Sequence, residues 1–191
     1  MKGSIDIDYK ALQTRVGRFL KGSSQTLAKS LAAAGITLYE GRGVCAGKGQ
    51  AIVRSESGEE MLTYDNIILS CGSSSASFPG LAPDGDAVLD STGVLNLPEV
   101  PESLIIVGAG AIGLELGDFF GMMGSKITIV EAAPHIAPTE DADIAKEMDR
   151  VQSKAGRTCI TGVMAKSLVT KDGQAELTLG DGRVLTASKA L

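Results

Sequence analysis

A glycine-rich turn between two apolar runs constrains the fold of this chain more than any other feature. Residues 104–107 read LIIV, residues 108–113 read GAGAIG, and a second apolar run at 127–130 ends at Glu131. This order of strand, glycine turn, helix, strand and terminal acid is that of a dinucleotide-binding βαβ unit. We therefore predict a doubly wound parallel α/β sheet of the Rossmann type, in three layers and with β-meanders, preceded by part of a second such unit.

The glycines of this turn have separate expected roles. Gly108 makes the tight turn, Gly110 lets a pyrophosphate approach the backbone, and Gly113 lets the helix pack closely on the strand. Unpaired N–H groups and the helix dipole favour an anion at the start of that helix. The residues expected to contact the dinucleotide are Gly108, Ala109, Gly110, Ala111, Ile112 and Gly113. The alternative is a glycine-rich turn that binds nothing.

The position and charge of Glu131 indicate which dinucleotide the chain binds. It follows Gly113 by 18 residues, about where an acid accepts hydrogen bonds from both hydroxyls of the adenosine ribose. A carboxylate at this position would repel a 2′-phosphate, and the next residues, Ala132 and Ala133, supply no arginine to hold one. The sequence therefore favours NAD(H) over NADP(H).

Composition argues against several other classes of function. The chain has 191 residues and a formal charge of −5, without a basic cluster, which argues against a nucleic-acid partner. No apolar run is long enough to span a bilayer. Charges interrupt residues 1–6, so we expect no signal peptide there and a cytoplasmic location. Cys45, Cys71 and Cys159 are far apart, so we expect no metal site, and Cys45 and Cys159 read as buried thiols in strands.

Periodicity and turn residues predict two successive sets of elements. The first set is a helix (9–34), a strand (36–39), three meander strands (44–45, 51–54, 61–63) and a strand (67–69). A connector at 73–101 contains one short helical turn after residue 92. The second set alternates strand and helix (104–108, 111–123, 126–131, 141–155, 157–160) and closes with a meander (164–186).

The two sets resemble each other, and each lacks a part that the other has. Residues 35–38 (GITL) match 156–159 (GRTC), and meanders follow both. We therefore expect a fragment cut at both ends, in which a first partial unit (1–72) and a linker (73–100) precede a second unit (101–191) that lacks its last strand. The strand at 104–107 would then have an open edge, and we expect strand exchange between chains, aggregation, or a missing segment that the parent protein holds in place.

Several motifs together resemble the pyridine nucleotide-disulfide oxidoreductase family, and most of all its dihydrolipoamide dehydrogenase branch. The resemblance covers nearly the whole chain, and the extended glycine motif makes it far more specific than GxGxxG alone. The matching segments are IILSCG (67–72), FPG (78–80), STG (91–93), VGAGAIGLELG (107–117) and VE (130–131).

The resemblance implies that residues 1–72 are a partial FAD-binding domain and residues 101–191 an NAD-binding domain, and it implies further cofactor contacts. Gly43, Ser70, Cys71 and Gly72 match places where the family backbone approaches FAD, although the family usually has Ala-Thr-Gly in place of Ser-Cys-Gly. Glu115 and Ile112 match positions near the nicotinamide, and Met164 aligns with an apolar contact to adenine. The alternatives are a first-turn acid stabilised by the helix dipole for Glu115, and core packing for Ile112 and Met164.

The resemblance also implies a reaction. The parent protein would oxidise a dihydrolipoyl group through a redox disulfide, reduce FAD and pass hydride to NAD+. It would be a homodimer and a component of a 2-oxo acid dehydrogenase complex. None of the family's catalytic residues has a match in this chain. We therefore expect that the chain alone does not complete the reaction. The alternatives are another NADH-linked flavoprotein reductase, of the disulfide or mercuric type, and an NAD-binding module without catalysis.

Overall fold

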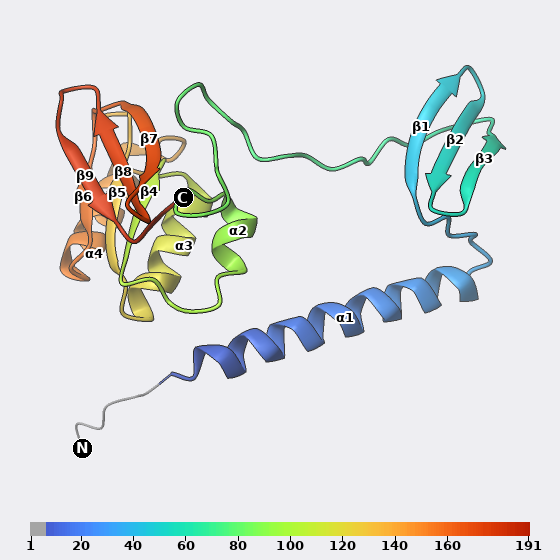
Figure 1. The fold of residues 1–191 in the computed structure, drawn as a ribbon, viewed down its shortest axis with the longest axis horizontal. Coiled ribbons are helices and arrows are strands. Elements are labelled where there is room, and N and C mark those ends of the chain that lie inside the picture. Colours follow the sequence, from blue (N-terminus) through green and yellow to red (C-terminus); the bar gives the residue numbers. More distant parts are fainter. Residues whose placement is uncertain (1–6) are drawn as a thin grey trace. The chain divides into compact units, whose positions relative to one another are not determined.

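The computed structural model describes residues 7–191, which form two compact units. The larger unit comprises residues 7–10 and 74–191, and the smaller comprises residues 11–73 (Figure 1). Residues 74–100, assigned to a linker from the sequence, thus pack in the same unit as the glycine-rich turn. Residues 1–6, on which the inference about a signal peptide depends, lie outside the described part of the chain.

A four-stranded parallel sheet forms the centre of the larger unit, with strand order β10-β4-β5-β6. Its strands are β4 (Ser103–Val107), β5 (Lys126–Val130), β6 (Thr158–Ile160) and β10 (Lys189–Ala190). Leu104 lies opposite Ile127, and Val107 lies opposite Val130. Strands that are covered on both faces need nearly continuous apolar runs. The apolar runs at 104–107 and 127–130 therefore predicted strands of this sheet. The predicted parallel α/β sheet is confirmed.

Helices and a meander cover opposite faces of this sheet (Figure 1). The covering elements are α3 (Ala111–Met122), α4 (Ala142–Lys154), β7 (Ala165–Lys171), β8 (Gln174–Leu179) and β9 (Val184–Ala187). Ile106 of β4 faces α3, whereas the neighbouring Ile105 joins the core formed with the meander residues Leu177 and Leu179. This alternation of side chains gives the three predicted layers of helices, parallel sheet and antiparallel meander.

The expectation of an open edge beside β4 needs correction. Lys189 and Ala190 form the short parallel strand β10 along this edge. The next residue, Leu191, donates its N–H to the carbonyl of Ile105 (2.9 Å) and accepts the N–H of Val107 (2.8 Å). On the other side of β10, the Ala190 N–H donates to the Ala87 carbonyl at 2.8 Å. Because the backbone groups of β4 have partners, strand exchange at this edge is no longer expected.

The smaller unit contains the predicted first meander, of β1 (Arg42–Gly47), β2 (Gln50–Ser55) and β3 (Gly58–Thr63). Its strands pair antiparallel in sequence order. The predicted strands at 36–39 and 67–69 do not form, and Ile68 is 90% exposed. A parallel strand needs a neighbour to pair with, and none of the described residues of this unit supplies one for these two segments.

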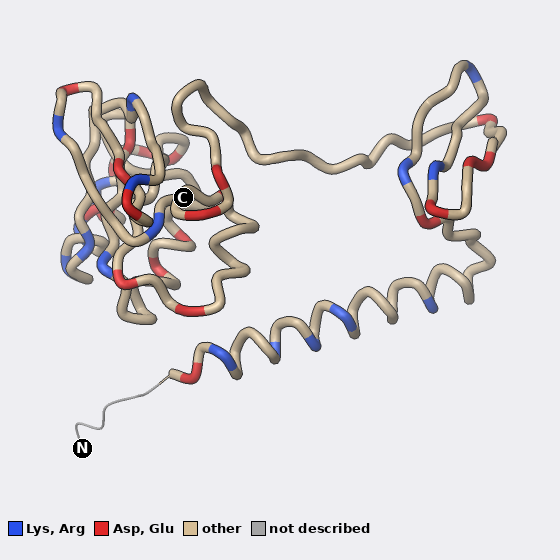
Figure 2. The backbone as a smooth tube through the Cα atoms, in the orientation of Figure 1, with Lys and Arg blue, Asp and Glu red and all other residues tan. Residues whose placement is uncertain are grey.

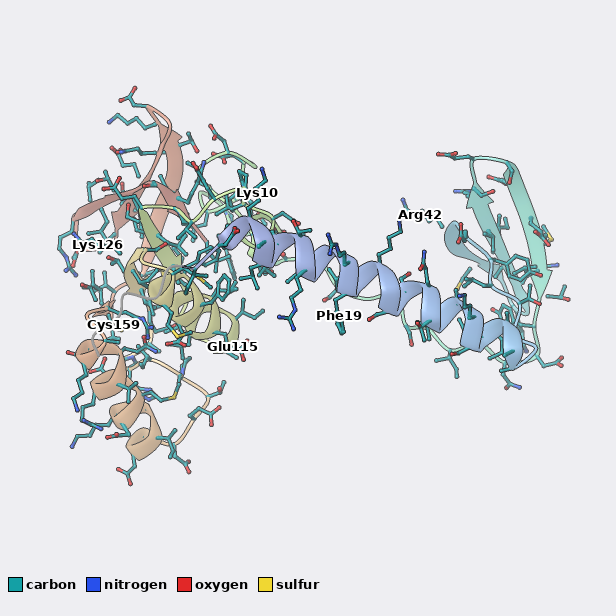
Figure 3. All side chains as sticks on the ribbon, turned by 90° about the horizontal axis from the view of Figure 1, so that it is seen from below. Lys10, Phe19, Arg42, Glu115, Lys126 and Cys159 are labelled. Carbon is teal, nitrogen blue, oxygen red and sulfur yellow. The ribbon has the colours of Figure 1, made fainter. Side chains whose placement is uncertain are left out.

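The helix α1 (Tyr9–Ala33) confirms the predicted long helix and is amphipathic. Its polar face carries lysines and arginines but no acidic residue, as the blue positions in Figure 2 show. Its apolar face includes Phe19 (71% exposed) and Leu27 (61% exposed), and Phe19 is labelled in Figure 3. The spacing of apolar residues in the sequence thus predicted the helix correctly. The described meander does not cover the apolar face of that helix.

None of the helices in the described residues is both long enough and apolar enough to cross a membrane.

Candidate functional site

The glycine-rich turn lies at the carboxyl end of β4, where ligands bind in open α/β sheets. Gly108 has a φ of +106°, a left-handed conformation that side chains rarely adopt. Its N–H donates to the carbonyl of Val130 at 2.8 Å, which continues the pairing of β4 with β5 into the turn. The positive φ at position 108 thus explains why this residue is glycine.

The other two glycines meet different surroundings. A Cβ at position 113 would overlap the carbonyl oxygen of Gly108 and lie 3.0 Å from Cγ2 of Ile106, so only glycine lets α3 approach the strand. At Gly110 a Cβ would have no protein atom within 4 Å, and φ is an ordinary −76°. Nothing in the described protein therefore requires glycine at position 110, whereas a ligand on the backbone would.

The first turn of α3 presents unpaired donors beside this open space. The N-cap residue is Gly110, which has no side chain to bond them. The first hydrogen bond of the helix runs from the Leu114 N–H to the Gly110 carbonyl at 3.0 Å. In the described part of the chain, the N–H groups of Ala111, Ile112 and Gly113 have no acceptor. Such donors, aligned with the helix dipole, suit a phosphate group.

Glu131 follows β5 and reaches back to the turn. Its Oε2 accepts the N–H of Ala109 at 2.8 Å, and its Oε1 accepts the N–H of Ala133 at 2.7 Å. The structure therefore brings the acid and the glycine-rich turn together at one edge of the sheet. Glu131 as a whole residue is half-buried.

A cavity of about 560 Å³ lies beside the turn, next to β4 and β10. Its lining is mostly apolar and includes Phe78, Leu81, Ile106, Ile112, Leu168 and Leu191. Sequence reasoning missed Phe78 and Leu81 as site residues, because only the folded chain brings the segment before α2 (Ser91–Leu95) against β4. This cavity and Glu131 flank the glycine-rich turn.

Asp90 is the polar residue that orders one wall of this cavity. Its Oδ1 accepts the N–H of Gly93 at 2.8 Å, which caps α2, and its Oδ2 accepts the hydroxyl of Ser75 at 3.0 Å. These hydrogen bonds, the Gly93 N–H first and the Ser75 hydroxyl second, lower the pKa of Asp90 below its ordinary value. The carboxylate is therefore ionised at neutral pH.

The remaining residues predicted near the dinucleotide lie on the surface of the same unit. Glu115 is exposed on α3 and is labelled in Figure 3, and Ile112 is 59% exposed one helical turn earlier. Met164 is 69% exposed, so it is not a core residue. The residue before it, Val163, donates its N–H to the carbonyl of Glu131 at 3.2 Å. Met164 therefore lies on the Glu131 side of the turn.

The residues predicted to approach FAD lie in the smaller unit. Gly43 is in β1, whereas Ser70, Cys71 and Gly72 form part of an exposed irregular segment. No hydrogen bond in the described residues joins Gly43 to this segment. The approach of these residues to FAD therefore stays a prediction.

The prediction of two buried thiols is correct in part. Cys45 is exposed, because the described residues leave its face of the meander strand uncovered. Cys159 is half-buried in β6. Burial, followed by the charge of Asp149, raises the pKa of Cys159, and the charge of Arg157 opposes the shift. Partial burial and a raised pKa are typical of an unreactive packing thiol.

Two further glycines of α3 were missed by sequence reasoning. A Cβ at Gly117 would lie 3.0 Å from Cδ1 of Ile106, and one at Gly121 would lie 2.8 Å from Nε of Arg157. The Arg157 side chain is 7% exposed and pairs with Asp118 at 2.7 Å. The four-residue spacing of Gly113, Gly117 and Gly121 is a signal that could have identified this close packing face.

Comparisons with known proteins agree with this architecture. The family model described as pyridine nucleotide-disulphide oxidoreductase matches residues 8–191. The chain therefore belongs to the pyridine nucleotide-disulphide oxidoreductase family. The dihydrolipoyl dehydrogenase branch of this family uses FAD and NAD(H).

Two curated relatives are dihydrolipoyl dehydrogenases. The one from Chlorobaculum tepidum is 34% identical over 171 residues, which are 89% of this chain and 36% of the relative. The one from Bacillus subtilis is 32% identical over 199 aligned positions, 97% of this chain and 42% of the relative. The chain thus spans about two fifths of the length of these relatives.

Solved structures show the same likeness. LpdA from Mycobacterium tuberculosis has a TM-score of 0.89 and 26% identity, and the match covers 99% of this chain and 43% of LpdA. The HOCl-induced flavoprotein disulfide reductase RclA from Escherichia coli, in its Cu(II) complex, has a TM-score of 0.87 and 26% identity. That match covers 96% of this chain and 42% of RclA.

Proposed function

We propose that residues 74–191 bind NAD(H) as the nicotinamide-dinucleotide site of a dihydrolipoyl dehydrogenase. The observation that carries this proposal is the open space over Gly110. No protein atom lies within 4 Å of a Cβ there, while unpaired N–H groups of α3 adjoin it. A turn with only a structural role would not need glycine at a position with ordinary dihedral angles and empty surroundings.

The residues around the turn suit the parts of the dinucleotide. The N–H groups of Ala111 and Ile112 would hold the pyrophosphate, and the carboxylate of Glu131 would accept the hydroxyls of the adenosine ribose. Met164 would contact adenine. On the opposite side of the turn, the apolar cavity and Ile112 would take the nicotinamide end, with Glu115 near it.

The activity of a whole protein containing this chain is part of the proposal. The flavin would supply the hydride, and the residues of this chain would orient the acceptor. Gly43, Ser70, Cys71 and Gly72 would contact FAD only in that larger protein. We further propose a homodimer, membership of a 2-oxo acid dehydrogenase complex and a cytoplasmic location. The cysteines at 45, 71 and 159 form no Cys-x4-Cys pair, so we expect these 191 residues alone not to oxidise dihydrolipoamide.

A fluorescence titration of this chain with NADH and, in parallel, NADPH tests the proposal. We expect NADH to bind more tightly by at least about tenfold, because Glu131 repels a 2′-phosphate. Absence of binding for both nucleotides, while circular dichroism shows a folded chain, would refute the assignment of the site. Equal binding of both would refute the assignment of nucleotide preference.

The likeness to RclA favours a second candidate, an NADH-linked flavoprotein disulfide reductase with another substrate. Activity assays on a longer protein that contains this sequence would distinguish the two candidates. Reduction of NAD+ that depends on dihydrolipoamide would select the first, and NADH oxidation by another disulfide without lipoamide turnover would select the second.

A further inference from the structure

Glu131 contacts more of the protein than the binding of a ribose requires. Its two oxygens accept the N–H groups of Ala109 and Ala133 at 2.8 and 2.7 Å. We propose that Glu131 is also the positioning residue of the glycine-rich turn, so that turn geometry and nucleotide choice depend on one carboxylate. The statement on nucleotide choice rests on the proposed function, whereas the statement on turn geometry does not.

The backbone of Ala109 makes this second role necessary. Ala109 is fully buried, at 0% exposure, so its N–H needs an acceptor within the protein. Its carbonyl accepts the N–H of Ala137 at 2.9 Å, and the neighbouring Gly108 N–H bonds to Val130. The Ala109 N–H therefore has one acceptor in the described residues, and this acceptor is the carboxylate of Glu131.

The loop after Glu131 is attached to the same group. The second carboxylate oxygen accepts the Ala133 N–H, and the Ala133 carbonyl accepts the N–H of Gly162 at 2.8 Å. Ala137, further along this loop, has a φ of +48°, which is unfavourable for a residue with a Cβ. Its bond to Ala109 helps to hold that conformation. Glu131 thus joins the glycine-rich turn to residues 132–137.

The chemistry of a carboxylate explains how one side chain serves both roles. Each oxygen of an ionised carboxylate has two lone-pair sites. One site on each oxygen of Glu131 is used by a backbone N–H, which leaves one on each for a ribose hydroxyl. Glutamine has only one acceptor oxygen, so its NH2 group would face one of the two backbone donors. Alanine would leave both donors unpaired.

A consequence for selectivity follows. Removing the negative charge at position 131 takes away the repulsion of a 2′-phosphate, but it also releases the turn that binds the pyrophosphate. We therefore expect Glu131→Gln and Glu131→Ala to lose NADH binding without gaining NADPH binding. If Glu131 contacted only the ribose, its substitution would instead give a variant with a weaker preference for NADH over NADPH.

Amide hydrogen exchange of the nucleotide-free 191-residue chain, measured by NMR, tests the positioning role. In the unsubstituted chain the Ala109 amide should exchange far more slowly than the neighbouring Gly110 amide, which is exposed. In Glu131→Gln and Glu131→Ala it should exchange roughly tenfold to a hundredfold faster, as expected for loss of a charge-assisted hydrogen bond. The control is Glu102→Gln, which removes an exposed acid with no side-chain partner in the described residues. The amides of β4 and β5 report whether each variant remains folded.

Three outcomes separate this inference from the proposed function. An Ala109 amide as unprotected as Gly110 in the unsubstituted chain would overturn the inference without any variant. Unchanged Ala109 exchange in Glu131→Ala, together with new NADPH binding, would overturn the inference and leave the nucleotide site intact. Faster Ala109 exchange in a chain that binds neither nucleotide would support the positioning role and refute the proposed function.

Discussion

Gly108, Gly110 and Gly113 occupy one turn, but different physical constraints act on them. A positive φ requires Gly108, and contact with a carbonyl oxygen requires Gly113. Position 110 has ordinary dihedral angles and no neighbouring atom, so the folded protein does not explain its glycine. Substitutions at single residues can therefore separate folding from binding within one short turn.

Gly110→Ala and Gly113→Ala form the first pair of predictions. We expect Gly110→Ala to leave the melting temperature unchanged and to weaken NADH binding by at least about tenfold, because a methyl group would occupy the space over the backbone. We expect Gly113→Ala to destabilise the unit by about 3 kcal/mol, because the carbonyl of Gly108 is fixed in the turn. Thermal unfolding and NADH fluorescence measure the two effects, and destabilisation by Gly110→Ala would contradict the assignment.

Asp90 gives a prediction on pH. Its pKa is lowered in the folded state, so the ionised carboxylate stabilises the protein above the ordinary pKa of 3.8, and this contribution is lost as pH falls through the folded-state value. Asparagine also caps helices but does not titrate. The difference in melting temperature between the unsubstituted chain and Asp90→Asn should therefore be constant from pH 7 to 5 and shift against the unsubstituted chain below about pH 4. A difference that does not change with pH would show that the charge of Asp90 contributes nothing.

At the scale of elements, the packing around a helix decides whether a glycine in it is required or only weakens the helix. Gly121 lies where α3 meets the buried Arg157 side chain, and a Cβ there would be 2.8 Å from Nε. Gly22 lies in the middle of α1 with nothing within 4 Å. The same residue type is thus required by packing in one helix and only weakens the other.

Alanine substitutions at these glycines should have opposite effects. Gly22→Ala should stabilise α1 by about 0.5–1 kcal/mol through the lower entropy of the unfolded chain. Gly121→Ala should destabilise the larger unit by about 1–3 kcal/mol, since Asp118 and Gln152 hold the Arg157 guanidinium in place. Peptide-resolved hydrogen exchange measures each helix separately. Destabilisation of α1 by Gly22→Ala would reveal a packing contact at this position.

At the scale of the whole molecule, the chain divides into two units with unequal internal support. The larger unit has a core in three layers, whereas residues 65–78 are irregular and exposed, with Ile68 at 90%. Segments with few buried contacts open at low free energy cost and are cleaved first by proteases. Limited proteolysis therefore reports how independent the two units are.

We expect thermolysin, which cleaves before apolar residues, to cut first within residues 65–78. The persistent product should begin near residue 74–79 and extend to Leu191, and NADH should slow its further digestion because bound ligand stabilises the folded state. Mass spectrometry of a time course identifies the products. A first cut within β4, α3 or β5 would contradict this division of the chain.

Local sequence predicted much of the site. The glycine-rich turn and the acid after β5 lie together as the motif requires, because β4, α3 and β5 follow one another along the chain and β4 pairs with β5. The cavity wall from Phe78 and Leu81 was not predicted, since these residues reach β4 only through tertiary packing. The bonds from Glu131 to Ala109 and Ala133 have no separate sequence signal either.

The sequence alone determined the periodic elements of this protein, but tertiary structure decided which predicted strands form. Residues 35–38 and 156–159 have similar sequences and follow helices. Only the second segment enters a strand, β6, because Cys159 lies opposite Ile129 of the neighbouring β5. The first segment has no such neighbour in the described residues of its unit and stays irregular. Local sequence sets helices through bonds within one segment, whereas a parallel strand exists only when a distant segment supplies its hydrogen-bond partners.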